Sequence, residues 1–272
     1  MESVAGQDVR GALPQGLGAA IGDTAQEIAA LLRQGADMAR PVPGSQWSVG
    51  QAAAHLALAN ELMADIAAGR GRPYGDGTPQ SLAAANEEAL AEFGERRAEP
   101  LAAMIVAQAD ACVTALTKRG AQEGVVTPLG PMDSDVLGSY LLTHMLGHGY
   151  DLARALGRGH MIDRVRVGLT LPFMITVMPR VTDTARTASL RASYAIRLWG
   201  GGQFGVAVAD GAVSVGPPPG RPDCTILIEP VTFLLMALGR CGQASALARG
   251  RILVRGRKPW LAPRFPALFT AP

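Results

Sequence analysis

The chain has 272 residues, of which 48% are hydrophobic, 5% aromatic and 18% charged. This composition argues against a disordered chain, and at roughly 150 residues per domain the length favours two domains. The 25 lysines and arginines nearly balance the 23 aspartates and glutamates. A balanced charge without polybasic clusters argues against nucleic acid and against a membrane surface as partners.

The cysteines, the N-terminal residues and the apolar runs indicate the cellular compartment of the protein. Cys112, Cys224 and Cys241 are an odd number and form no Cys-x-x-Cys pair, which disfavours both a disulfide framework and a cysteine zinc site. Residues 1–16 are polar, unlike a secretory signal. The most apolar run, 169–178, contains a proline and is shorter than the ~20 residues that span a bilayer. We therefore expect a cytoplasmic protein.

The first 160 residues carry the periodicity of helices. Apolar residues recur every three to four positions, and turn-forming residues separate the runs. Ser48 is placed to cap the second helix, Pro100 is expected to break the third, and Gly157 ends the fourth. We predict helical stretches at 21–38, 49–68, 81–119 and 135–156, with loops at 41–44, 69–79 and 120–131.

After about residue 186 the pattern changes to alternation of apolar and polar residues, which is typical of strands. Asp210-Gly211 is a strong signal for a two-residue hairpin turn. Pro230 opens an amphipathic helix that runs to Gly239. We predict strands at 189–199, 204–209, 212–215, 224–228 and 251–254, forming a small antiparallel sheet in an α+β domain.

Three of the four histidines fall in the predicted bundle helices. His144 and His148 are four residues apart, so a helix places both imidazoles on one face, one turn apart. His55 lies in the second helix among small apolar residues. If these helices pack together, the three imidazoles meet in a bundle core and leave one position open, as in a catalytic zinc site. The alternative is that they are core histidines without a metal; His160, in a predicted loop, receives no role.

Other charged residues are candidates for supporting roles. Asp151 follows His148 by three residues and could orient its imidazole, or else pair with Arg154 or cap the helix. The C-terminal region is basic, and Arg251 and Arg255 lie on or beside a short glycine-flanked strand. Either could clamp a carboxylate with its planar guanidinium, the alternative being a solvated face. The sequence assigns no residues to the binding of an organic cofactor.

Several segments occur together in a recognisable order. They are Pro-Val-Pro-Gly at 41–44, Trp-Ser-Val-Gly at 47–50, Ala-His-Leu at 54–56 and the run from Leu142 to Gly157 that contains His-Gly-Tyr-Asp. With Asn86, they make residues 15–160 resemble the N-terminal domain of the mycothiol-dependent maleylpyruvate isomerase family. The resemblance implies a DinB-like, up-down four-helix bundle that holds a divalent metal, usually zinc, through His55, His144 and His148.

The second half carries a resemblance of its own. Residues 223–240 and 250–256 are similar to the sterol-carrier-protein-like domain that often follows this bundle. The expected architecture is therefore α+β with two domains, a bundle at 15–160 and a small α+β domain with an antiparallel sheet at 187–272.

The resemblance also implies an activity. The metal would activate a low-molecular-weight thiol, mycothiol or a similar one, for isomerisation of or S-transfer to a small electrophilic substrate, in a monomer or homodimer. In the maleylpyruvate isomerase of this family the position matching His144 is an acid, so an all-imidazole site would leave the metal more electrophilic. The alternatives are a biosynthetic cyclase or metal-assisted hydrolase without a thiol, and a non-enzymatic protein that binds a hydrophobic ligand.

Overall fold

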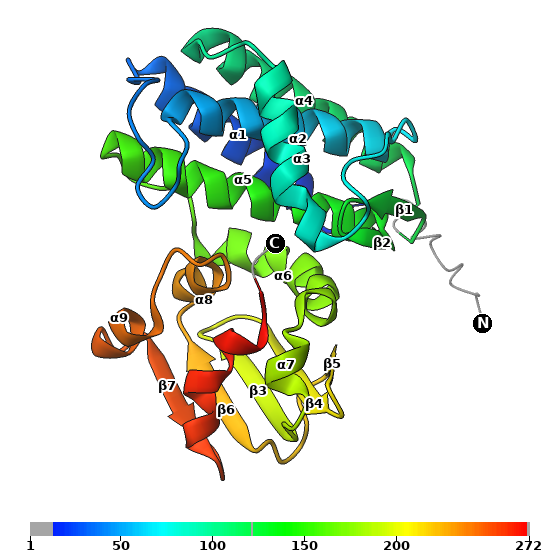
Figure 1. Cartoon of the computed structure of the whole chain (residues 1–272), viewed down its shortest axis with the longest axis vertical. Coiled ribbons are helices and arrows are strands. Elements are labelled where there is room, and N and C mark those ends of the chain that lie inside the picture. Colours follow the sequence, from blue (N-terminus) through cyan, green and yellow to red (C-terminus); the bar gives the residue numbers. More distant parts are fainter. Residues whose placement is uncertain (1–12, 121, 271–272) are drawn as a thin grey trace, which may run out of the picture.

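The computed structural model describes residues 13–120 and 122–270, in which a helical bundle stands above a smaller α+β unit (Figure 1). In the bundle, α4 and α5 each pack against both α1 and α2, and the short α3 lies outside α2. Ile21, Leu56 and Leu141 are among the side chains fully enclosed between the helices. The bundle helices are α1 (Leu17–Arg33), α2 (Val49–Ala67), α3 (Leu82–Glu92), α4 (Ala98–Lys118) and α5 (Ser134–Leu156).

The start of α2 brings this helix deep into the bundle. The Ser48 hydroxyl accepts the N–H of Gln51, and the Gln51 side chain accepts the N–H of Ser48, which completes a capping box. The backbone approaches closely at Gly50, whose N–H donates to the Met38 carbonyl oxygen at 2.8 Å and where a Cβ would lie 3.1 Å from that oxygen. The next turns of α2, including His55, lie in the interior.

Two predicted helix boundaries differ from the structure. The first helix begins at Leu17 and ends at Arg33, because Gly35 takes a positive φ of 76° that a helix cannot continue. The long third stretch is divided at 93–97 rather than at Pro100, which lies in the first turn of α4, where the N–H that proline lacks is not needed.

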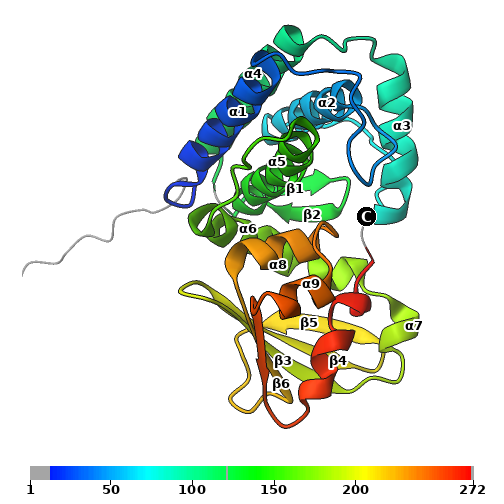
Figure 2. The same cartoon turned by 90° about the vertical axis from the view of Figure 1, so that its left-hand side faces the viewer.

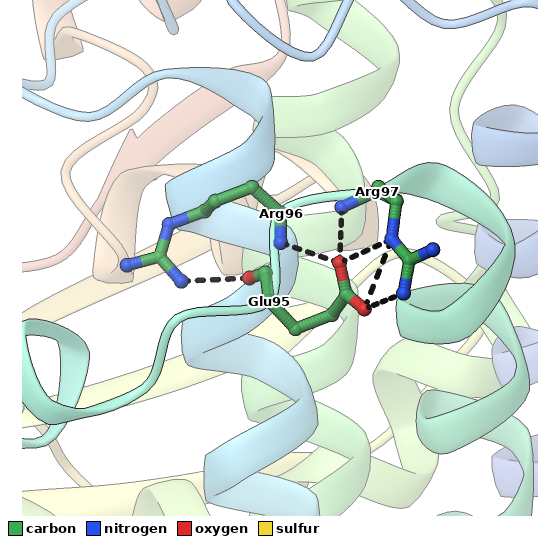
Figure 3. Close-up of polar contacts among 3 residues, drawn as sticks. All are labelled: Glu95, Arg96 and Arg97. Carbon is green, nitrogen blue, oxygen red and sulfur yellow. Dashed lines mark hydrogen bonds and ion pairs between the residues drawn. The ribbon is translucent and has the colours of Figure 1, made fainter.

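The segment between α3 and α4 is held by its own charged residues. Figure 3 shows the Glu95 carboxylate accepting the backbone N–H groups of Arg96 and Arg97 and the Arg97 guanidinium. The Arg96 guanidinium in turn donates to the carbonyls of Leu90 and Phe93 at the end of α3. Helix ends leave such carbonyls without partners, so Arg96 fixes where α3 stops.

The predicted loop at 120–131 holds a short antiparallel hairpin of β1 (Gly124–Thr127) and β2 (Gly130–Asp133). Helix α4 is long and apolar enough, by length and composition alone, to cross a membrane. In the structure it packs against α1 and α2, with Leu101, Ile105 and Leu116 buried and Asp110 exposed. This is the pattern of a bundle core helix.

A further helix, α6 (Arg164–Val177), lies between the two predicted domains and packs against α5. Pro172 interrupts its hydrogen-bond ladder. The Ser139 hydroxyl of α5 enters the gap, donating to the Leu169 carbonyl at 2.8 Å and accepting the Phe173 N–H at 3.1 Å. Insertion of a side chain into the ladder at a proline ties α6 firmly to the bundle. A 3₁₀ turn at Met178–Val181 and α7 (Thr184–Thr187) follow.

The α+β unit is built on a five-stranded sheet in the order β5-β4-β3-β6-β7. Asp210 and Gly211 form the predicted hairpin turn with positive φ values of 51° and 80°. One strand pair departs from the predicted antiparallel sheet, because β6 pairs with β3 in parallel. The chain leaves β5 through a proline-rich loop and returns on the far side of β3, so β6 runs in the same direction as β3. The strands are β3 (Ala192–Leu198), β4 (Gln203–Ala209), β5 (Ala212–Gly216), β6 (Cys224–Ile228) and β7 (Ile252–Arg255).

Helix α8 (Pro230–Ala237) and α9 (Gln243–Ala248) connect β6 to β7, and 3₁₀ turns at 259–264 and 266–268 follow β7. Figure 2 shows α8 beneath the bundle, near α6. The predicted α+β architecture, a helical bundle followed by a smaller unit with a mainly antiparallel sheet, is confirmed.

Candidate metal centre

Three histidines from two helices meet inside the bundle. His55 comes from α2, and His144 and His148 come from adjacent turns of α5. One ring nitrogen from each lies within 4.8 Å of the others, and the Nε2 atoms of His55 and His144 are 3.1 Å apart. The ring centroids are separated by 4.6 to 5.0 Å. The structure thus brings together the three histidines that the sequence singled out. His160 lies elsewhere, against Tyr150.

Burial keeps the imidazoles of His55 and His144 neutral. His55 is 5% exposed, and burial together with the charge of His148 lowers its pKa to about 3. Burial, followed by the charges of His148, His55 and Arg240, lowers the pKa of His144 far below its usual range. The His144 Nδ1 atom is also buried without a hydrogen-bond partner among the described residues. Neutral imidazoles with free lone pairs are ligands for zinc and similar divalent ions, so the cluster fits such a metal.

A carboxylate and an arginine extend the cluster across to the α+β unit. Asp151 Oδ2 lies 3.5 Å from His148 Nδ1, and its side chain is 14% exposed. Arg240, which follows α8, donates two hydrogen bonds of 2.8 and 3.2 Å to this carboxylate. Burial alone would raise the pKa of Asp151, but the hydrogen bonds from His148 and Arg240 lower it overall. The alternative partner considered for Asp151, Arg154, is not the residue it pairs with.

The two arginines selected from the sequence have other surroundings. Arg251 lies 3.4 Å from Glu229, and Arg255 is exposed at the opposite end of β7. Of the three predicted catalytic residues, only Asp151 contacts a histidine of the cluster. Arg240 belongs to the basic C-terminal residues, but the sequence offered no reason to select it, because its position depends on how α8 packs under α5. Gly239, with a positive φ of 73°, turns the chain there.

Aromatic side chains form the walls of the cluster. The Trp47 ring centroid is 4.7 Å from that of His55 and 6.1 Å from that of His148. Tyr140 meets His144 edge-on at 6.5 Å and stacks on Phe173 of α6 at 4.3 Å. The sequence could have predicted the contact of Trp47 with His55. Trp47 directly precedes the cap of α2 and so lies beside the turns that carry His55.

Asn86 and Tyr74 connect α3 with the α2–α3 loop. The Tyr74 hydroxyl donates to the Asn86 Oδ1 atom at 2.6 Å. Burial and the nearby Tyr74 raise the pKa of Tyr140, so its hydroxyl stays protonated. Asn86, noted from the sequence, thus lies in a polar contact with Tyr74 rather than among the three histidines.

The protein's own thiols lie outside the cluster. Burial raises the pKa of Cys112 to about 12, and burial also raises the pKa of Cys224. Cys241 is partly exposed beside Arg240, with its sulfur 3.7 Å from the Gly242 carbonyl oxygen. A thiolate is the nucleophilic form of sulfur. Chemistry based on a thiol at this cluster would therefore use a thiol supplied from outside.

Comparison with known proteins agrees with this architecture. Residues 19–153 match the family model for the mycothiol maleylpyruvate isomerase N-terminal domain, and residues 178–258 match the SCP-2 sterol transfer family. A crystal structure of a histidine-to-alanine mutant of the mycothiol-dependent maleylpyruvate isomerase is 12% identical to this chain, with a TM-score of 0.55. That alignment covers 86% of this chain and 92% of the isomerase, so the two proteins share a fold.

Other matches are weaker. A second structure of the isomerase is 13% identical over 85% of this chain and 91% of its own, with a TM-score of 0.47. The inverting sec-alkylsulfatase Pisa1 from Pseudomonas sp. is 13% identical over 50% of this chain, with a TM-score of 0.32. This chain spans only 24% of the sulfatase's length. No curated protein sequence matches the chain. The N-terminal family match shows that the bundle of this protein belongs to the mycothiol maleylpyruvate isomerase family, a family of enzymes, and the shared fold extends over most of the chain.

Proposed function

We propose that this protein is a metal-dependent enzyme that activates a low-molecular-weight thiol, mycothiol or a close relative, for isomerisation of or S-transfer to a small electrophile. The observation that carries the proposal is the cluster of three histidines between α2 and α5, backed by Asp151 and Arg240. The family match supports the use of a thiol. The unfavourable surroundings of Cys112 and Cys224 are consistent with a thiol from outside the chain.

His55, His144 and His148 are the residues that would hold the divalent ion, and zinc suits three imidazoles. When bound, such an ion supplies positive charge that lowers the pKa of a nearby thiol, as it does for water. The three ligands bring no negative charge of their own, so they would not reduce this effect as a carboxylate ligand does. This distinguishes the site from the acid-containing one implied for the maleylpyruvate isomerase, and it favours a different electrophile as the natural substrate.

The remaining residues would orient and protect the site. Asp151 can accept the Nδ1 proton of His148, which leaves the Nε2 lone pair free to face the cluster. Arg240 keeps Asp151 ionised and in place through its two hydrogen bonds. Trp47 and Tyr140 keep water away from the imidazoles, which strengthens electrostatic interactions within the site.

The test is a turnover assay in which metal and thiol are varied separately. Purified protein, stripped with a chelator and reloaded with zinc, is given mycothiol and a panel of electrophiles that includes maleylpyruvate, other cis-enones, epoxides and alkyl halides. Turnover should require both the metal and the thiol. Counting thiol separates the two reaction types, because an isomerisation regenerates it, whereas S-transfer forms a sulfur–carbon bond and consumes one thiol per product. Equal turnover without the thiol would contradict the proposal and favour a hydrolase or cyclase.

A further inference from the structure

The α+β unit borders an apolar cavity and a basic one. The apolar cavity, of about 330 Å³, has Val177, Phe233 and Gly239 among its walls. The basic one, of about 290 Å³, lies between the end of α5, the helices α8 and α9 and the start of β7. We call it the arginine pocket, after the four side chains that give it its charge: Arg154, Arg240, Arg249 and Arg251.

These four arginines come from separate parts of the chain. Arg154 belongs to the last turn of α5, and Arg240 follows α8. Arg249 follows α9, and Arg251 precedes β7. Guanidinium groups repel one another, so gathering four of them around one cavity costs free energy unless negative charge offsets them. None of the described residues that line the pocket is an aspartate or a glutamate. The lining therefore has the composition of an anion-binding site.

The contacts around the pocket balance only part of this charge. Arg240 pairs with Asp151 at 2.8 Å, and Arg251 lies 3.4 Å from Glu229. Both side chains stay partly exposed, and Arg240 keeps N–H donors beyond these contacts. In the described part of the chain, the other two arginines of the pocket have no carboxylate within ion-pair distance. Two positive charges thus remain, and a ligand with two negative charges would balance them.

The pocket lies beside the histidine cluster and not within it, because none of the three histidines lines it. Tyr150 and Arg154, which do, are four residues apart and share a face of α5. Tyr150 follows His148 by two residues and so points to a different side of the helix. The link between the two places is Arg240, which lines the pocket and also contacts Asp151. A ligand in the pocket would therefore occupy a site of its own.

We infer that the arginine pocket binds a phosphate group, either free or as a small phosphate monoester. Near neutral pH such a group carries close to two negative charges and presents several acceptor oxygens. Planar guanidiniums bind these oxygens in pairs, and the hydroxyls of Tyr150 and Ser245 add further donors to the lining. The pocket is at the small end of the range for ligand sites, which favours a small ester over a nucleotide. The inference goes beyond the proposed function and does not depend on it.

The test is a calorimetric titration of the full-length protein at low, fixed ionic strength in a phosphate-free buffer. The probes are inorganic phosphate, glycerol 3-phosphate and the dicarboxylate succinate. Each is titrated into zinc-loaded and into chelator-treated protein, because phosphate can also bind a metal. One phosphate should bind per chain, with the same affinity in both forms, and succinate should bind more weakly. Tighter binding of glycerol 3-phosphate would identify the ester as the ligand, and equal binding would identify free phosphate.

Matched variants locate the binding. Arg154→Gln and Arg249→Gln each remove one guanidinium from the pocket and should weaken phosphate binding about tenfold, the effect of one charge-assisted hydrogen bond. Arg154→Lys keeps the charge without the planar fork and should lose less. The control is Arg255→Gln, which removes an exposed arginine at the opposite end of β7 from Arg251 and should leave the affinity unchanged. Melting temperatures check that each variant is folded.

Each outcome decides the inference. Saturable binding of one phosphate that is weakened by either pocket substitution, and not by Arg255→Gln, supports it. Binding that requires zinc places the anion on the metal and overturns the inference. So does an equal loss in Arg255→Gln, an unchanged affinity in both pocket variants, tighter binding of succinate than of phosphate, or the absence of saturable binding. None of these results bears on the turnover assay, so the proposed function is tested separately.

Discussion

The helical bundle and the α+β unit contribute different groups to the junction between them. The bundle is tightly packed, and it encloses a small group of nitrogen ligands. The α+β unit encloses apolar space and contributes one charged group, Arg240, to the neighbouring cluster. Ligand sites often form where two such bodies meet. Under the proposed function, the bundle would supply the metal ligands, and the α+β unit would supply Arg240, which contacts Asp151 beside them.

The largest expected effect tests whether the bundle histidines bind a metal. His148→Ala removes one of three proposed ligands and should abolish most metal binding, measured as zinc per chain by elemental analysis, with turnover lost in parallel. The matched control is His160→Ala, because His160 is exposed and lies outside the cluster. Full zinc occupancy in His148→Ala would show that these histidines are core residues and not ligands.

Removing the charged contact between the two units should have the next largest effect. Partners that orient a ligand imidazole typically contribute 10- to 100-fold to metal affinity or activity. We expect a loss in that range for Arg240→Gln and for Asp151→Asn, with the double variant little worse than either, because the residues act as a unit. The readout is the zinc dissociation constant alongside kcat.

The control for this pair is Arg33→Gln, which breaks an exposed ion pair with Glu99. Exposed pairs contribute about 0 to 1 kcal/mol, so zinc affinity should not change. If Arg240→Gln lowers thermal stability but leaves the zinc affinity and kcat intact, Arg240 only joins the two units and does not position His148.

The pH dependence of stability tests the enclosure of the imidazoles. In the unfolded chain a histidine titrates near pH 6.5, whereas burial lowers the pKa of His55 to about 3 in the folded protein. Below pH 6.5 the unfolded state therefore binds more protons, and the free energy of unfolding falls as the pH falls. Between pH 6.5 and 5 the loss from His55 alone should be about 2 kcal/mol.

Chemical denaturation of the chelator-treated protein across this pH range measures the loss. His55→Gln should flatten the dependence, because glutamine does not titrate. A stability that stays constant from pH 6.5 to 5 in the metal-free protein would mean that the cluster opens to water once the ion is removed.

The helices and the histidine pair could be predicted because their determinants are local. The spacing of His144 and His148 needs only a helix, and the cap at Ser48 needs only its own first turn. The residues that were missed depend on distant partners. Arg240 reaches Asp151 across 89 positions of the chain, and the parallel pairing of β3 with β6 depends on the route of a loop. Helix α6 was not predicted because Pro172 interrupts it, and the Ser139 hydroxyl that compensates belongs to α5.

The smallest expected effect is on stability. It compares how the two regions tolerate a larger side chain. At Gly149 in α5, a Cβ would lie 2.8 Å from the Met161 sulfur and 3.1 Å from Ile28. Gly149→Ala should therefore destabilise the protein by about 1 kcal/mol or more, because overpacking outweighs the gain in helix propensity. Val177→Ile adds one methylene at the cavity wall and should change stability by less than about 0.5 kcal/mol. Denaturant midpoints compare the two, and equal losses would mean that the cavity is closed in solution.

The cysteines differ in exposure, so one of them can be labelled selectively to follow ligand binding. Burial holds the pKa of Cys112 at about 12 and also raises the pKa of Cys224, whereas Cys241 is partly exposed. A maleimide dye at neutral pH should therefore attach to Cys241 and spare the other two. That attachment point adjoins Arg240 and is two residues from the cavity wall at Gly239. The unmodified chain thus carries a single labelling handle, and the emission of a polarity-sensitive fluorophore there could follow ligand arrival in real time.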